Sequence, residues 1–156
     1  MKKTNKGFSL VELIIVIAIM AILAGALAPQ LIKYINKSRL ASDVQTGASI
    51  ASAVNAALAS EECYDAAATY DGNVTAVASL IGANDAFAKE VKSALGNTTG
   101  KGKSKKDIDG SAIAAANQQF YLKLNLNANE VEVYYGNAGT DKGFLCAPTS
   151  GSKMAK

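Results

Sequence analysis

The chain has 156 residues, of which 49% are apolar and 6% aromatic, and its 16 basic and 13 acidic side chains give a formal charge of +3. This length predicts one domain, and the absence of histidine excludes a histidine-centred catalytic triad and a histidine metal site. A net positive charge would fit a nucleic-acid or membrane-surface partner, so the positions of the basic residues decide what the charge means.

The N-terminal 28 residues combine a basic leader with a long apolar run. Three lysines stand before Gly7: Lys2, Lys3 and Lys6. The 21 residues from 8 to 28 then carry Glu12 as their only charge. As a helix this run would be about 30 Å long, which is enough to cross a bilayer. The segment is therefore predicted to span a membrane or to pack among helices as apolar as itself.

Two ordinary interpretations of this segment are a cleaved secretory signal peptide and a plain signal anchor. Residues 26–28 read Ala-Leu-Ala, which is the small-residue pattern of a signal-peptide cleavage site. Pro29 would directly follow that cut, which is unfavourable for cleavage. The apolar pattern also continues through residues 31–35, as it would in a longer helix. Both details count against a signal peptide.

Residues 6–13, Lys-Gly-Phe-Ser-Leu-Val-Glu-Leu, resemble the type III leader motif of type IV pilins and pseudopilins. The resemblance implies that a dedicated membrane peptidase cuts between Gly7 and Phe8 and methylates the new amine of Phe8. It also implies that Glu12 pairs with the N-terminal amine of a neighbouring subunit during assembly. Pro29 falls where many pilins carry a proline that loosens or breaks the helix inside the filament.

The chemistry of Glu12 agrees with that role. An unpaired carboxylate in a dry helix bundle costs several kcal/mol, so an ammonium from a neighbouring chain would neutralise Glu12 and also set the register. The alternative is that Glu12 lies at the membrane surface in an isolated helix. There the positive end of the helix dipole would stabilise its negative charge. The firm resemblance to type IV pilins covers about residues 1–40. Beyond these residues the resemblance is only in the predicted architecture.

Residues 29–60 are predicted to form the amphipathic half of the same helix. Apolar residues recur there at three- and four-residue steps, flanked by Ile50: Leu40, Val44, Ala48, Ala51, Val54 and Leu58. A helix from Phe8 to Ser60 would be about 80 Å long, more than a globular body of this size, so part of it must protrude. The alternative is two helices broken at Pro29.

Residues 61–156 are predicted to form a globular head. Two short helices and three strands are expected at residues 74–81, 85–95, 118–126, 130–135 and 143–146. Asp85 is a candidate N-cap of the second helix, and Gly96 follows its end. A small antiparallel sheet with one apolar face would cover the stripe of the long helix. This α+β architecture resembles the pilin fold.

A polar loop from 96 to 110 contains the one basic run outside the N-terminal region: Lys101, Lys103, Lys105 and Lys106. A solvated loop is the ordinary interpretation, and contact with DNA or another anionic surface is the alternative, although no aromatic residue interleaves with the lysines. Residues 102–104 do not form a phosphate-binding loop, because Asn97 stands where a glycine is needed and no buried strand precedes it. No cofactor or metal is predicted.

Two cysteines, Cys63 and Cys146, lie far apart in the sequence. Two thiols without histidine do not make a zinc site. With the head outside the cell, as the resemblance implies, a disulfide would tie the end of the long helix to the last strand. The chain-entropy model assigns such a bridge roughly 4–5 kcal/mol. Two buried free thiols are the alternative.

The resemblance implies a non-enzymatic protein, the major subunit of a type IV pilus. The precursor would be anchored in the cytoplasmic membrane by lipid contact and would then join copies of itself in an extracellular filament for adhesion, surface motility or DNA uptake. Its other partners would be the prepilin peptidase and the assembly platform with its ATPase-driven machinery. Removing three of the 16 basic side chains with the leader leaves 13, which equals the 13 acidic ones.

Two alternatives to a major pilin stay open. A pseudopilin of a type II secretion system shares the whole N-terminal motif, but major pseudopilins usually carry an acidic calcium-binding loop near the C-terminus. Residues 137–142 hold only Asp141, which weakens that alternative. A signal-anchored envelope enzyme is less favoured, because the sequence contains no recognisable catalytic constellation.

Overall fold

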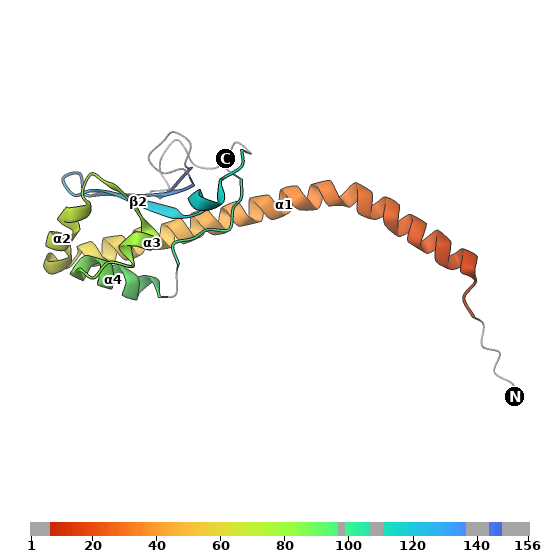
Figure 1. Ribbon diagram of the computed structural model, residues 1–156, viewed down its shortest axis with the longest axis horizontal. Helices are drawn as coiled ribbons and strands as arrows, with labels where there is room; N and C mark the ends of the chain where they lie inside the picture. Colours follow the sequence, from red (N-terminus) through yellow and green to blue (C-terminus); the bar gives the residue numbers. More distant parts are fainter. Residues whose placement is uncertain (1–6, 97–98, 107–110, 137–143, 148–156) are drawn as a thin grey trace, which may run out of the picture. The chain divides into compact units, whose positions relative to one another are not determined.

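The computed structural model describes residues 7–96, 99–106, 111–136 and 144–147. Its helices and strands are, in chain order, α1 (Leu10–Leu58), α2 (Glu61–Ala67), a 3-10 turn η1 (Ala68–Tyr70), β1 (Val74–Ala76), α3 (Val77–Leu80), α4 (Ala86–Leu95), η2 (Ala115–Asn117), β2 (Phe120–Asn125), β3 (Glu130–Tyr135) and β4 (Phe144–Ala147) (Figure 1). The chain divides into two compact units, residues 1–37 and 38–156. The fold is α+β, with a long N-terminal helix packed against a small antiparallel sheet, as predicted.

The first unit contains the apolar half of α1, and Pro29, where the alternative interpretation divided the segment into two helices, lies inside this one helix. α1 runs without interruption from Leu10 to Leu58 with Pro29 in its interior. An interior proline removes the hydrogen bond to residue i−4, which is Gly25 here, and crowds that carbonyl. The alanines and leucine at 26–28 have high helix propensity and favour continuation of the helix through this defect.

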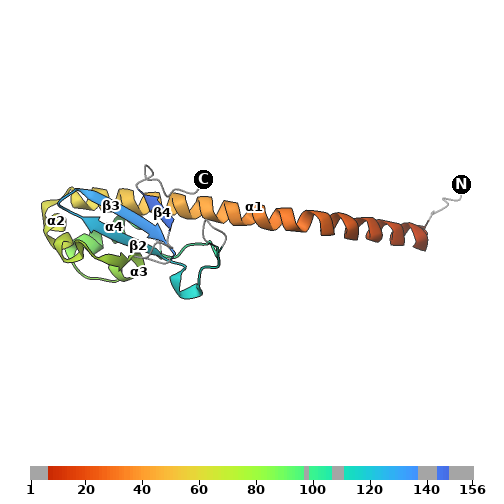
Figure 2. The same ribbon diagram turned by 90° about the horizontal axis from the view of Figure 1, so that it is seen from above.

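The second unit contains a four-stranded antiparallel sheet in the order β1-β2-β3-β4. Figure 2 shows β2, β3 and β4 side by side along α1. The predicted alternation of β2 and β3 is confirmed, since the two strands pair in register from Phe120↔Tyr135 to Asn125↔Glu130. Their predicted turn follows, with the Ala128 N–H donating to Asn125 Oδ1 at 3.1 Å.

One strand was not predicted. Residues 74–81 were expected to form a helix, but Val74–Ala76 form β1 and the helix α3 begins only at Val77. Val74 and Thr75 are β-branched, which disfavours helix and favours strand, and β1 pairs with residues 121–123 of β2. The prediction failed because this pairing partner lies about fifty residues away in the sequence.

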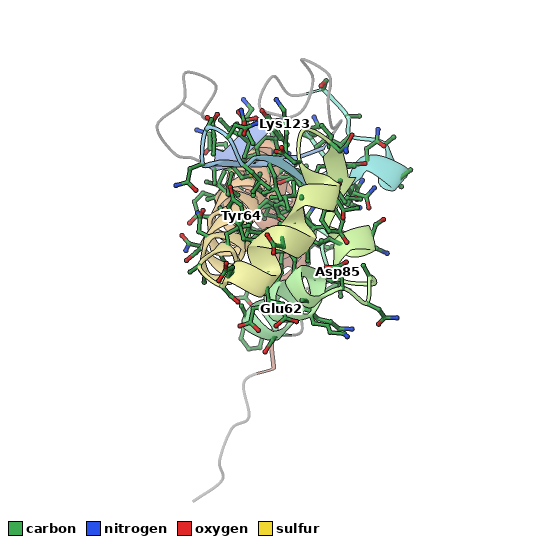
Figure 3. All side chains as sticks on the ribbon, turned by 90° about the vertical axis from the view of Figure 1, so that its left-hand side faces the viewer. Glu62, Tyr64, Asp85 and Lys123 are labelled. Carbon is green, nitrogen blue, oxygen red and sulfur yellow. The ribbon has the colours of Figure 1, made fainter. Side chains whose placement is uncertain are left out.

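The predicted N-cap of α4 is confirmed at Asp85, which is labelled in Figure 3. Asp85 Oδ1 accepts a hydrogen bond from the Ala88 N–H at 2.8 Å, and Gly96 ends the helix with φ +60°. The Tyr70 hydroxyl donates to Asp85 Oδ2 at 2.5 Å. Partial burial raises the pKa of Asp85, but the hydrogen bonds from Tyr70 and Ala88 lower it more, so that it lies below its ordinary value. Asp85 therefore joins η1 to α4 as well as capping α4.

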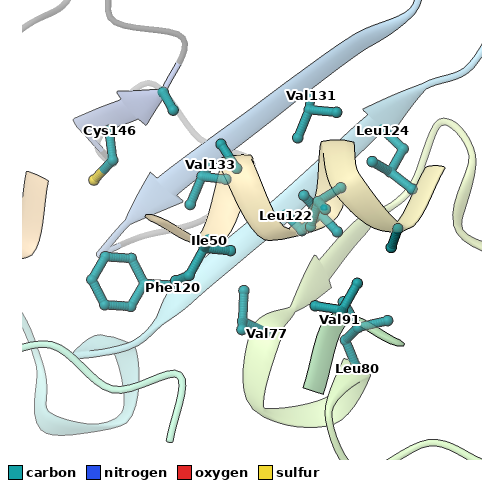
Figure 4. Packing of buried hydrophobic residues seen from close by; sticks show 14 of the residues in the cluster. Ile50, Val77, Leu80, Val91, Phe120, Leu122, Leu124, Val131, Val133 and Cys146 are labelled. Carbon is teal, nitrogen blue, oxygen red and sulfur yellow. The ribbon is translucent and has the colours of Figure 1, made fainter. Parts of the chain in front are cut away.

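The hydrophobic core lies between the inner face of the sheet, the C-terminal part of α1 and the short helices α3 and α4. Figure 4 shows Ile50 of α1 among side chains of β2 and β3 such as Leu122 and Val133. The short helices add four side chains that are completely buried: Val77, Leu80, Phe87 and Val91. In the second unit, α1, the short helices and the sheet therefore all contribute side chains to one hydrophobic core.

The buried face of α1 is rotated relative to the predicted stripe. The buried positions of α1 are Asp43, Gly47, Ile50, Ala51, Ala53, Val54 and Ala57. Leu40, Val44 and Leu58 pack against the core but are only partly buried. The centre of the face passes through an aspartate and a glycine, and a search for apolar periodicity assigns neither of them to a core.

The predicted disulfide is absent from the structure, in which Cys63 and Cys146 are both free and both buried. Cys146 lies on β4 against Gly47, where an added Cβ would be 2.2 Å from the Cys146 Cβ. Gly47 precedes the end of α1 by eleven residues, or about 16 Å, and Cys63 lies on α2, which follows that end. A disulfide needs Cα atoms within about 7 Å of each other. The structure corresponds to the alternative of two buried thiols.

Candidate functional site

A capping box closes the N-terminal end of α1. The Val11 N–H donates to Ser9 Oγ at 3.3 Å, and the Ser9 N–H donates to Glu12 Oε2 at 2.9 Å. The first N–H groups of a helix have no helical carbonyl to which they can donate, and these two bonds supply acceptors at the helix start. Glu12 thus has a partner within its own chain. Sequence reasoning missed Ser9, although the Ser-x-x-Glu spacing before an apolar run was the available signal.

The peptide bond between Gly7 and Phe8 lies just outside this helix. The capping box makes Leu10 the first helical residue, so both residues precede the helix. Phe8 is 90% exposed, and a Cβ added at Gly7 would have no neighbour within 4 Å. This bond is therefore sterically open to a peptidase, because no described part of the chain covers it.

The apolar run of α1 is uncovered by the rest of its own chain. Every residue from 7 to 35 is exposed, and the large apolar side chains range from Ile35 at 39% to Leu10 at 75% within α1. Among the described residues, α1 is the one helix long and apolar enough to cross a membrane. Exposed apolar surface costs about 25 cal/mol per Å² in water. Lipid or other apolar helices must therefore cover this surface.

A comparison with models of known protein families gives a match that falls on this segment. Residues 2–28 match the family model of the prokaryotic N-terminal methylation motif. This is the leader motif of type IV pilins and pseudopilins. Comparison with curated proteins and with solved structures gives no match. The motif supports a protein of the type IV pilin or pseudopilin class, which is a structural rather than an enzymatic class.

The segment that matches the leader motif contains three of the six sequence-predicted site residues. Gly7, Phe8 and Glu12 all lie in the matched segment, within six residues of each other. The three leader lysines and the residues at 137–142 lie outside the described residues. In the described part of the chain, no group of three or more His, Cys, Asp or Glu side chains is placed to hold a metal ion.

A second arrangement of polar groups lies in the head and involves the lysine loop, defined here as residues 101–106. The carboxylate of Asp43, 1% exposed, accepts two hydrogen bonds from this loop. The Lys103 N–H donates to Oδ1 at 2.8 Å, and the Ser104 N–H donates to Oδ2 at 2.6 Å. The Tyr135 hydroxyl donates to the Ser104 carbonyl oxygen at 2.7 Å. These three bonds hold the loop backbone against α1 and β3.

Two glycines permit this close packing. A Cβ at Gly102 would lie 2.1 Å from the ring of Tyr135, and a Cβ at Gly100 would lie 2.7 Å from the Ala78 nitrogen. Gly100 also has φ +70°, a conformation that other residues rarely adopt. The side chains of Lys101, Lys103, Lys105 and Lys106 all stay exposed. The predicted polar loop is thus a fixed platform that presents four ammonium groups.

Burial changes the chemistry of the groups beside Asp43. Burial and the nearby Asp43 carboxylate raise the pKa of the Tyr135 hydroxyl, and the same two causes raise the pKa of the Cys146 thiol to about 12. Both groups are therefore neutral at physiological pH, and the thiol is a poor nucleophile. Their arrangement around Asp43 suits a structural clamp rather than a catalytic centre.

Proposed function

We propose that this chain is the major subunit of a type IV pilus, which is made as a membrane-anchored precursor and then assembled into an extracellular filament. The observation that carries the proposal is the leader motif directly before a capped helix whose apolar surface its own chain leaves uncovered. A filament supplies that cover, because neighbouring copies of the same apolar helix can surround each other. Lipid would serve the same purpose in the precursor.

Processing would begin at the exposed bond between Gly7 and Phe8. The prepilin peptidase would cut this bond and methylate the new amine of Phe8. Cleavage would also remove the three leader lysines and bring the side-chain charge of the subunit to zero. Before cleavage those lysines favour retention of the N-terminus on the cytoplasmic side of the membrane.

Glu12 would then guide assembly. A carboxylate accepts several hydrogen bonds, so Glu12 can keep the Ser9 N–H and also bind the ammonium of Phe8 from a neighbouring subunit. Burial of both charges among apolar helices would be costly unless they meet, and this requirement would fix the register of neighbouring subunits. The assembly platform and its ATPase-driven machinery would move the subunit from the membrane into the filament.

The same motif would serve a pseudopilin of a type II secretion system, which is the second candidate. The major pilin is favoured because residues 137–142 carry one acidic residue, Asp141, where an acidic calcium-binding loop would need several. Adhesion, surface motility and DNA uptake are the activities that such a pilus would support. A signal-anchored envelope protein is the least favoured candidate.

Mass spectrometry of filaments sheared from intact cells tests the proposal. The expected N-terminal peptide begins at Phe8 and carries a methyl group on its amine. Filament subunits that retain residues 1–7 would contradict the proposal. Cleaved and methylated subunits that never appear outside the cell would instead favour the pseudopilin.

A further inference from the structure

The acidic residues of the head fall into two groups with different uses. Between Arg39 and Lys89 the sequence has no basic residue and six acidic ones: Asp43, Glu61, Glu62, Asp65, Asp71 and Asp85. Three of them bind groups of their own chain, since Asp43 holds the lysine loop, Asp71 Oδ1 accepts from the Leu126 N–H at 2.9 Å, and Asp85 caps α4. The other three project from α2 and are exposed. We call Glu61, Glu62 and Asp65 the acidic face.

The stability of α2 does not account for the whole acidic face. Glu61 and Glu62 lie in the first turn, where a negative charge favours the helix dipole. Asp65 lies in the last turn of α2 (Glu61–Ala67), where its charge opposes the dipole, and aspartate has low helix propensity. The one ion pair formed among the described residues joins Lys123 to Glu132, so no described cation forms an ion pair with Asp65. The exposed carboxylate of Asp65 is therefore available to a partner outside its own subunit.

The lysine loop lies at the other end of the same unit. Asp43, which binds the loop, precedes the end of α1 by fifteen residues, or about 22 Å, and α2 follows that end. The four lysines of the loop outnumber Asp107 and Asp109, which follow it in the sequence. The head thus carries two faces of opposite charge, separated along α1.

We propose that the acidic face of one head docks on the lysine loop of another copy of this chain. This inference rests on the proposed filament. Two complementary faces at different places on one subunit form a heterologous contact, and such a contact repeats from copy to copy into an open filament wherever its rotation does not close into a ring. The three hydrogen bonds that fix the loop reduce the ordering that docking would otherwise require.

Charge reversal in full-length protein tests this docking. Asp65→Lys is compared with Glu90→Lys, which reverses an exposed carboxylate on α4 and changes the net charge equally. Two further variants each reverse one face, Glu62→Lys with Asp65→Lys for the acidic face and Lys103→Glu with Lys105→Glu for the lysine loop. A fifth variant combines these four changes. The readout is the fraction of cleaved subunit that is recovered in sheared filaments, followed by filament survival in low and high salt.

Reversal of either face is expected to lower the filament fraction about fivefold, since exposed charge pairs contribute modestly. The combined variant should recover most of that loss, and Glu90→Lys should behave as the wild type. The difference in filament survival should shrink in 1 M salt, where charges are screened beyond about 3 Å.

Three results would overturn the docking. The first is normal assembly of both face variants, and the second is failure of the combined variant to recover. The third is normal assembly of the Lys103→Glu, Lys105→Glu variant with loss of DNA retention on its filaments, which would assign the loop to a nucleic acid. A wild-type chain that is cleaved but forms no filament would reject the proposed function itself.

Discussion

The two roles of Glu12, helix cap and assembly partner, can be separated by substitution. Glutamine also serves in a capping box, so Glu12→Gln should keep the bond from the Ser9 N–H and the start of α1 at Leu10. It removes the charge that would meet the Phe8 ammonium of a neighbouring subunit. Ser9→Ala is the matched control, because it removes the cap that Ser9 Oγ provides to Val11 and leaves the carboxylate in place.

The expected magnitudes differ enough to distinguish the roles. Loss of a serine cap costs about 0.5–2 kcal/mol of helix stability. Loss of one member of a buried ion pair costs about 3–5 kcal/mol, which lowers an equilibrium constant at least about a hundredfold. Glu12→Gln should therefore reduce sheared filaments to background, whereas Ser9→Ala should leave most of them.

Quantitative mass spectrometry of the sheared and membrane fractions provides the assay. Both variants should be cleaved after Gly7 and should be found in the membrane fraction, which shows that the subunit is made and processed. The pairing role is refuted if Glu12→Gln forms filaments at the wild-type level. If Ser9→Ala loses filaments as completely as Glu12→Gln does, the cap rather than the ion pair controls assembly.

Three further predictions concern the head and use full-length protein in detergent. Asp43→Ala leaves the N–H groups of Lys103 and Ser104 without their acceptor and should lower the free energy of unfolding by about 3–5 kcal/mol in urea titrations, and a loss below about 1 kcal/mol would contradict the clamp. Cys63 and Cys146 should resist a thiol reagent in the native protein and should both react in denaturant without reductant; a failure to react would show a disulfide. Because the folded state lowers the pKa of Asp85, its contribution should be complete above about pH 4 and should be lost as the pH falls through the folded pKa. Asp85→Asn keeps a capping oxygen and should flatten this part of the pH profile, so an unchanged profile would contradict the assignment.

Sequence reasoning predicted best the features that depend on neighbouring residues. The leader motif has fixed local spacing, and the cap of α4 at Asp85 was read from a short pattern before the helix. The alternation of β2 (Phe120–Asn125) and β3 (Glu130–Tyr135) follows from burial of one sheet face, which the sequence shows directly. These features need no knowledge of distant parts of the chain.

The features that the sequence did not predict depend on contacts between distant segments. β1 forms because Val74–Ala76 meet the edge of β2, and Asp43 belongs to the core because the lysine loop covers it with N–H donors. The predicted disulfide required Cys63 and Cys146 to meet, which depends on how far along α1 each of their elements packs. Apolar spacing and composition contain no information about these contacts between distant segments.

The buried positions of α1 begin at Asp43, and this divides one continuous helix into two segments in which substitutions have different consequences. Substitutions in the N-terminal segment, from Leu10 to Lys37, alter no core packing of the head, so a melting experiment on the isolated protein should not register them. Their effects should appear only when copies meet or when lipid is present. A stability screen of single subunits would therefore pass sequences that cannot polymerise, and only a screen for filaments would reject them.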